Sequence, residues 1–193
     1  MASFQSNSPL TLLLIFLFVI IISIHHSHGD EDESEEPLRG TELAKLICNN
    51  TSYNKFCVDT LTPVSPDARA SDIADSALRL AQVAANDART IIANLLTDRS
   101  SPIQQQERHI LQGCQLDNNL ATANLTAASN DLNSDTIDSM IDDLNSAANV
   151  TKSCQDIIKK TRFSAMLSDK NMDVIRLCDI CVVCTQFFDP DDL

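Results

Sequence analysis

The chain has 193 residues, of which 27 are acidic and 14 are Lys or Arg, so its formal net charge is −13. Such an acidic protein repels nucleic acid and anionic lipid and favours basic partners. With no Trp, one Tyr and three Gly, the sequence also lacks the stacked aromatic rings of a sugar platform and the glycine-rich loop of a phosphate site.

The apolar run Leu10–Ile24 predicts a secretory signal peptide. It is shorter than the roughly 20 residues that a membrane span needs. Small residues follow it, with Ser27 and Gly29 at the −3 and −1 positions of a cleavage site. We therefore expect residues 1–29 to be removed and the mature chain to be secreted, free of the membrane; an uncleaved anchor is the alternative. Residues 30–40 are expected to be an acidic, disordered N-terminus.

The first ordered segment expected in the mature chain is residues 41–64, which hold two cysteines nine positions apart, Cys48 and Cys57. A segment this small cannot build a core of its own. A disulfide between the two cysteines is the simplest way to brace it. The sequence therefore predicts an N-terminal helical hairpin closed by Cys48–Cys57.

Residues 67–188 carry four amphipathic stretches, which predict an all-α, up-down-up-down four-helix bundle behind the hairpin. In the first stretch, apolar residues recur at intervals of three and four, as on one face of a helix. Short links between the stretches make successive helices antiparallel neighbours. Residues 189–193 are expected to be a C-terminal tail. The four stretches begin near residues 67, 102, 136 and 169.

Cys114 and Cys154 are expected to face each other across the second and third helices. Cys114 lies about 20 residues before the predicted turn at Asn133–Ser134, and Cys154 lies about 20 residues after it. The constant rise per residue of a helix brings both to the same height in an antiparallel pair. A Cys114–Cys154 disulfide is therefore predicted, and the loop-entropy model gives it a stabilisation of about 4 kcal/mol.

Three more cysteines, Cys178, Cys181 and Cys184, lie at helical spacing in the last stretch. They are interpreted as a stripe of buried free thiols, as partners in a further disulfide, or as metal ligands, although a fourth ligand cannot be named. A free-thiol redox protein is one possible function.

No sign of an enzyme, a cofactor or a metal is found elsewhere in the sequence. After removal of residues 1–29 the one remaining histidine is His109, and neither His-Glu-x-x-His nor Gly-x-Ser-x-Gly occurs. Sequons for N-glycosylation do occur, and the overlapping pair at 49 and 50 cannot both be used. The candidate glycosylation sites are Asn49, Asn50, Asn124 and Asn149.

Three segments of the chain resemble the plant invertase and pectin methylesterase inhibitor family, over about residues 41–177. They are ICNNTSYNKFCVDTL around the first two cysteines, LQGCQLDNNLATANL around Cys114, and LNSAANVTKSCQD around Cys154. The resemblance implies a four-helix bundle preceded by a helical hairpin. It also implies disulfides that join the first cysteine to the second and the third to the fourth.

The resemblance further implies a secreted inhibitor, in the apoplast or cell wall more than in the vacuole, whose rigid helix face covers the substrate cleft of an enzyme in a 1:1 complex. The family's Pro-Lys-Phe motif, which is linked with invertase inhibition, is replaced here by SNDLNSDTIDS. Pectin methylesterase is therefore the expected partner. Acid invertase, or a non-inhibitory bundle with a structural or signalling role, is the alternative. Candidate contact residues, chosen for expected exposure, are Asp117, Asn118, Thr122, Asp138, Asp142 and Asn145.

Overall fold

The computed structural model describes residues 38–62, 64–98 and 103–189. The predictions for the signal peptide and for residues 30–37 lie outside these ranges, as does most of the predicted tail. None of the helices in the described part of the chain is both long and apolar enough to cross a membrane. All regular elements within the described ranges are helices.

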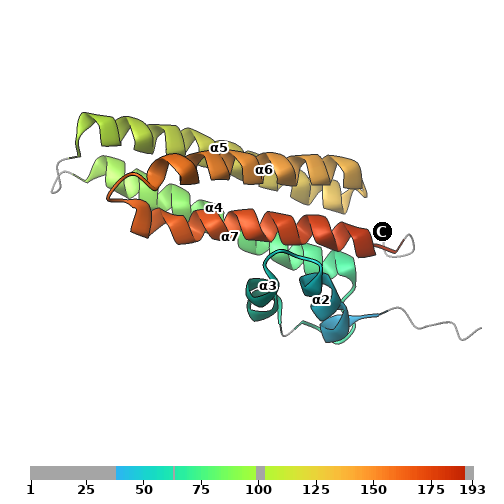
Figure 1. Cartoon of the computed structure of the whole chain (residues 1–193). Coiled ribbons are helices and arrows are strands. Elements are labelled where there is room, and N and C mark those ends of the chain that lie inside the picture. The colour runs from blue at the N-terminus through green and yellow to red at the C-terminus, as the bar shows by residue number, and fades with distance from the viewer. Residues whose placement is uncertain (1–37, 63, 99–102, 190–193) are drawn as a thin grey trace, which may run out of the picture. The chain divides into compact units, whose positions relative to one another are not determined.

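Four long helices form the bundle, and successive helices run in opposite directions (Figure 1). Each helix packs against two others, in the closed order α4–α5–α6–α7–α4. The predicted all-α bundle is thereby confirmed. The helices are α4 (Ala70–Thr97), α5 (Gln105–Asn133), α6 (Ile137–Ile158) and α7 (Ser164–Cys184), followed by the short 3-10 helix η1 (Thr185–Phe187).

Two short helices, α2 (Gly40–Asn49) and α3 (Asn54–Leu61), precede the bundle and pack against each other. A disulfide joins Cys48 to Cys57, with 5.4 Å between their Cα atoms, so this pair is the one that the sequence predicts. Figure 1 shows the two helices beside α7 and α4, and residues of both short helices belong to the same apolar core as those long helices.

Polar residues of α7 hold the disulfide-closed hairpin. The guanidinium carbon of Arg176 lies 5.0 Å from the ring centroid of Phe56 and 5.7 Å from that of Tyr53, within cation–π range. One turn further along α7, Asp179 accepts a hydrogen bond from the backbone of Ser52. Burial raises the pKa of Asp179, and this hydrogen bond partly offsets the rise. These contacts attach the N-terminal hairpin to the last helix, α7.

The interior of the bundle contains two apolar clusters with a polar layer between them along α5, α6 and α7. Alanines make up much of the buried side of α4, which allows its neighbours to approach closely. In the polar layer, the amide nitrogen of Asn171 donates to the Gln155 side-chain oxygen at 3.3 Å, and Thr151 donates to the carbonyl of Ala147. Such pairing lowers the cost of burying polar groups, although the side-chain oxygens of Asn118 and Asn171 have no hydrogen-bond partner in the described ranges.

The fourth bundle helix begins at Ser164, five residues before the predicted start near Asp169. The reason is that Phe163 and Leu167 are both buried in the apolar cluster that contains Leu111 and Ile158. The first turn of α7 therefore completes the core at that end of the bundle.

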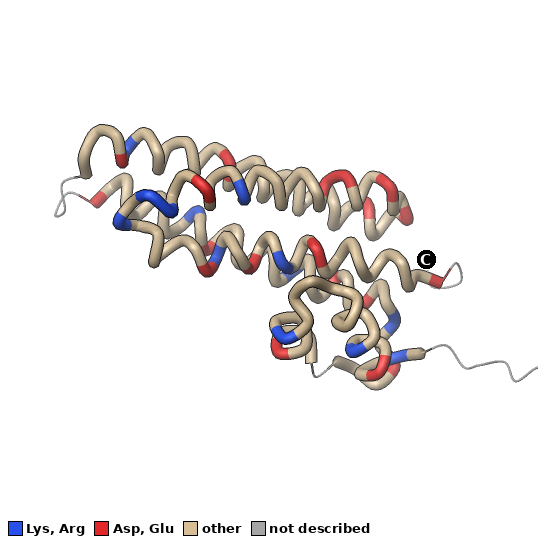
Figure 2. The backbone as a smooth tube through the Cα atoms, in the orientation of Figure 1, with Lys and Arg blue, Asp and Glu red and all other residues tan. Residues whose placement is uncertain are grey.

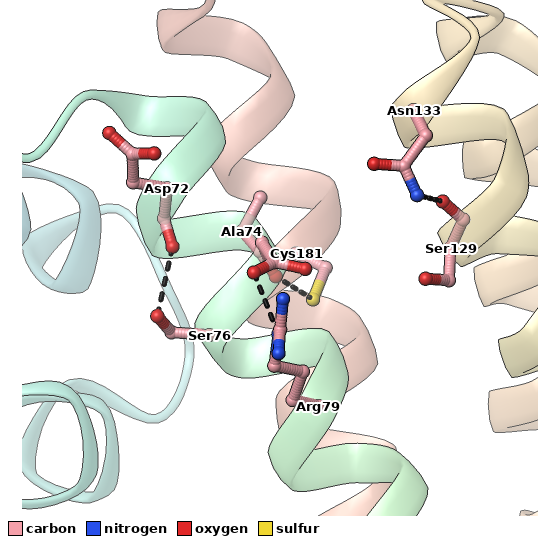
Figure 3. A network of polar contacts seen from close by, with 8 residues as sticks. Asp72, Ala74, Ser76, Arg79, Ser129, Asn133 and Cys181 are labelled. Atoms are coloured by element: carbon pink, nitrogen blue, oxygen red, sulfur yellow. Dashed lines mark hydrogen bonds and ion pairs between the residues drawn. The ribbon is translucent and has the colours of Figure 1, made fainter.

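Cys178, Cys181 and Cys184 are free and buried, which is the first of the three interpretations above. The thiol of Cys181 donates to the backbone carbonyl of Ala74 at 3.5 Å (Figure 3). Burial raises the pKa of Cys178 and of Cys184 to about 12, and it also raises that of Cys181. In the described ranges, no group of three or more His, Cys, Asp or Glu side chains is placed to hold a metal ion.

These thiols should react very slowly in the native protein, because the thiolate is the reactive species and burial disfavours it. With a colorimetric disulfide reagent at pH 8, we expect reaction of the folded protein to be at least 100-fold slower than that of the unfolded protein. Three thiols should then react in denaturant. Rapid reaction of the folded protein would show that α7 opens readily or that these side chains are accessible.

Candidate functional site

The turn between α5 and α6 fixes the two helices as an antiparallel pair. Asn133 closes α5 by donating from its side-chain amide to the carbonyl of Ser129 at 2.7 Å (Figure 3). Asp135 has a φ of 56°, a left-handed conformation that Asp tolerates better than most residues. Thr136 then donates from its hydroxyl to the Asp131 carboxylate at 2.9 Å and from its N–H to the Asp131 carbonyl.

A disulfide between Cys114 and Cys154 joins α5 and α6 at the far end of the pair from the turn. Their Cα atoms are 4.8 Å apart and their sequence separation is 40 residues. This is the pair that the sequence predicts. The two helices are thus connected at both ends, which makes the outer surface of the pair a preformed face. We call this surface the α5–α6 face.

Of the six predicted contact residues, three are exposed on α6 and a fourth is half-buried on α5. Asp138, Asp142 and Asn145 are exposed on α6, where their spacing of four and three places them on one stripe. Asn149, a candidate glycosylation site, is also exposed and continues this stripe. Asp117 is half-buried on α5 and accepts a hydrogen bond from Ser153 of α6; burial raises its pKa more than this bond lowers it.

The prediction for Asn118 is wrong, because this residue is fully buried. Its spacing from Cys114 and Ala121 places it on the inward stripe of α5. Its amide nitrogen donates to the Cys114 carbonyl at 3.0 Å and lies 3.8 Å from the Cys154 sulfur. Its polarity predicts a surface position, but here a polar side chain fills a core position beside the disulfide.

Thr122 is half-buried, and its hydroxyl donates to the Asn118 carbonyl one turn back. Its helical position is closer to the inward stripe of α5 than to the outer face. Of the other glycosylation candidates, Asn124 is half-buried on α5, whereas Asn49 and Asn50 are exposed at the end of α2. Their modification stays a prediction.

The turn end of the α5–α6 pair is strongly acidic. Residues 131–143 contain five Asp and no Lys or Arg. Acidic positions gather at this end of the two helices in Figure 2. There, burial raises the pKa of Asp143, and the nearby carboxylates of Asp131 and Asp142 raise it further.

Replacing Asp143 with Asn should stabilise the protein at pH 7 by a few tenths of a kcal/mol, because it removes a partly buried charge and its repulsion with Asp131 and Asp142. The raised pKa of Asp143 means that the folded state binds its proton more tightly than the unfolded chain does. The native carboxyl group therefore gains stability as the pH falls through that pKa, and the advantage of Asn should vanish near pH 3. Urea denaturation at pH 7, 5 and 3 measures this, with Asp138→Asn as the matched control. A benefit that does not depend on pH would contradict this explanation.

Exposed apolar side chains lie along the outer side of the same helices. Leu116 and Leu120 of α5 are 70% and 50% exposed, and Ile157 of α6 is 38% exposed. Near Ile157 the two helices border an open groove of about 730 Å³. The predicted contact residues do not include these leucines, although their spacing of four on the side opposite Cys114, Ala121 and Leu125 indicates outward-facing side chains. The groove is lined by Gln105, Gln106, His109, Ile110, Ile157 and Lys160.

Together, the bundle, its two disulfides and the preformed α5–α6 face define a rigid, disulfide-braced helical module suited to binding another protein. The family model described as plant invertase/pectin methylesterase inhibitor matches residues 42–183, and the chain belongs to this family. The resemblance noted in the sequence is thereby confirmed. The description of the family names inhibitors of invertase and of pectin methylesterase.

Two solved structures share the fold. The crystal structure of a pectin methylesterase inhibitor from Arabidopsis thaliana is 17% identical and covers 77% of this chain and 98% of its own, with a TM-score of 0.59. The crystal structure of a mutant form A of a pectin methylesterase inhibitor from Arabidopsis is 19% identical and covers 74% and 95%, with a TM-score of 0.66. No curated protein matches the chain.

Proposed function

We propose that the chain is a secreted inhibitor of pectin methylesterase that acts in the apoplast or cell wall and covers the substrate cleft of the enzyme with the α5–α6 face, in a 1:1 complex. The observation that carries this proposal is the family match over residues 42–183. The two structural neighbours, both pectin methylesterase inhibitors, agree with it. The alternative target that the family description allows is acid invertase.

The α5–α6 turn supports pectin methylesterase as the target. In the family, a Pro-Lys-Phe motif in this region is linked with invertase inhibition, and here the turn reads SNDLNSDTIDS. The Asp side chains at the turn end of the pair would also suit a basic enzyme surface.

The rigidity of the face supports inhibition by simple coverage. Because the turn and the Cys114–Cys154 disulfide hold the helix pair in place, binding orders little backbone, and less of the interaction free energy is lost to conformational entropy. The acidic side chains would chiefly raise the rate of association, since exposed charges act over about 10 Å at 0.1 M salt.

The test is to mix the purified mature chain, residues 30–193, with a panel of pectin methylesterases and acid invertases and to measure residual activity. We expect near-complete loss of pectin methylesterase activity at a small molar excess, and full invertase activity. The association rate should fall several-fold between 20 and 300 mM NaCl. Inhibition of the invertases alone would reverse the assignment of the target, and inhibition of neither class would overturn the proposal.

A further inference from the structure

We infer that Asn149, in the middle of α6, is a site of N-linked glycosylation, and that its surroundings favour it over the other three sequons. The inference rests on the proposed function, because these glycans are added to chains that enter the secretory pathway. The donor is a lipid-linked diphosphate oligosaccharide. The amide nitrogen of Asn149 bonds to C1 of the first sugar and loses a proton, and the lipid diphosphate leaves.

The side chain of Asn149 is open to solvent on the outer side of α6. Together with Val150 and Thr151 it forms the sequon, and it is exposed. Residues at spacings of three and four before and after it are its neighbours on the helix surface. A glycan can leave this position without displacing a packed side chain, since all four neighbours are polar and exposed. They are Asn145, Ser146, Lys152 and Ser153.

Asn124, which lies on α5 in a sequon of the same Asn-x-Thr form, has the opposite surroundings. It is half-buried, and two of its four neighbours at spacings of three and four, Ala121 and Ala128, are fully buried. A sugar attached there would emerge beside the packed inner stripe of α5. The surroundings of the Asn side chain, and not the motif, therefore separate the two sequons.

The overlapping sequons at the end of α2 are exposed, but their Asn side chains already make hydrogen bonds. The side-chain amide of Asn50 donates to the Leu46 carbonyl at 2.9 Å, and the side-chain oxygen of Asn49 accepts from Asn54 at 2.8 Å. A sugar on either residue would have to fit around these contacts of the disulfide-closed hairpin. Within the described ranges the side chain of Asn149 makes no such bond.

The burial of Thr151 is compatible with modification of its sequon. Thr151 is fully buried, and its hydroxyl donates to the Ala147 carbonyl at 2.8 Å. The attaching enzyme recognises this hydroxyl as part of the sequon, so the glycan has to be added to the nascent chain before α6 forms. Once the helix has formed, Thr151 faces the core and Asn149 carries the glycan outward.

The glycan also narrows the proposed binding face. Asn145 and Asp142 precede Asn149 on the same stripe of α6, within two turns of it. A bulky, hydrated oligosaccharide beside them leaves α5 and the turn end of the pair as the parts of the α5–α6 face that an enzyme can approach. An endoglycosidase should therefore trim the glycan as fast in the complex as in the free chain. Protection of the glycan in the complex would contradict this arrangement.

The experiment uses the full chain, expressed in a eukaryotic host that secretes it. Peptide-N-glycosidase in heavy-oxygen water converts each glycosylated Asn to a labelled Asp, and peptide mass spectrometry locates the label. We expect label at residue 149 in most molecules, and in few molecules at any of the other three Asn. Asn149→Gln should lose the mass of one glycan, whereas the matched Asn124→Gln should keep it. Thr151→Val, which retains Asn149 but removes the hydroxyl of the sequon, should lose it as well.

The outcomes separate this inference from the proposed function, because the readout is a mass and not an inhibition. A secreted wild-type chain that inhibits pectin methylesterase but is unmodified at Asn149 would overturn the site alone, as would heavier labelling of Asn124 than of Asn149. A chain glycosylated at Asn149 that inhibits no pectin methylesterase would overturn the proposed function and leave the site standing. A chain that never enters the secretory pathway would overturn both.

Discussion

Replacing both Cys114 and Cys154 with Ala should lower the free energy of unfolding by about 4 kcal/mol. The bond closes a loop of 40 residues that contains the whole α5–α6 turn, so its loss frees a large part of the unfolded chain. Both cysteines are also fully buried beside Leu111 and Ile158, and the bond is the covalent link between the two helices that form the binding face. Urea denaturation of the purified protein measures the loss.

The matched control for this prediction is removal of the other disulfide by Cys48→Ala/Cys57→Ala. That bond closes only nine residues, and the same loop-entropy model gives it about 2.5 kcal/mol. The α5–α6 variant should therefore be the less stable of the two by roughly 1–1.5 kcal/mol. Equal losses, or a larger loss from the hairpin variant, would contradict the dominance of loop closure. The α5–α6 variant should also inhibit more weakly, because its face is no longer fixed at both ends.

Gly40→Ala should destabilise the protein by about 2–3 kcal/mol, since the change adds both backbone strain and a steric clash. Gly40 begins α2 with a φ of +59°, a left-handed conformation that disfavours any side chain. A Cβ atom there would lie 2.4 Å from the Pro66 carbonyl oxygen, which belongs to backbone and cannot swing aside. The N–H of Gly40 also donates to the Ala68 carbonyl at 2.8 Å, so any shift breaks the tie between the hairpin and the start of α4.

Gly113→Ala is the control for this substitution, because Gly113 lies inside α5, where a Cβ atom would meet only the Ile157 side chain at an ordinary 3.9 Å. Alanine has the higher helix propensity, so this change should stabilise the protein by about 0.5–1 kcal/mol. The two glycine variants are therefore expected to shift the unfolding midpoint in opposite directions. A Gly40→Ala variant as stable as the wild-type chain would show that the junction at Pro66 can rearrange.

The parts of the fold that follow regular spacing could be predicted from the sequence. The pairing of Cys114 with Cys154 follows from helix rise and the position of one turn, and the bundle follows from four apolar stripes. The burial of Asn118 could not be predicted from polarity, since its environment depends on a polar layer contributed by three helices. The start of α7 at Ser164 depends on the burial of Phe163 and Leu167. Their burial follows from how the link after α6 folds back onto the bundle, which the local sequence pattern does not show.

The sequence places the contact candidates on the second and third bundle helices, and the binding of a partner by this surface stays a prediction. Asp138, Asp142 and Asn145 were selected because polar residues are usually exposed, and they are exposed here. Leu116 and Leu120 were passed over because leucine is usually buried, although their position opposite the core stripe of α5 identified them as outward-facing. Where polarity and helical position disagree, as they also do at Asn118, helical position is the better guide.

Hydroxyl-radical footprinting of the mature chain, alone and bound to a pectin methylesterase, tests the central claim most directly. It reports which exposed side chains become shielded in the complex, and exposed Leu and Met residues lie on different sides of the bundle. We predict strong protection of Leu116 and Leu120 on the α5–α6 face, with Met166 of α7 as reactive as in the free chain. Protection of Met166, with Leu116 and Leu120 unchanged, would contradict the account.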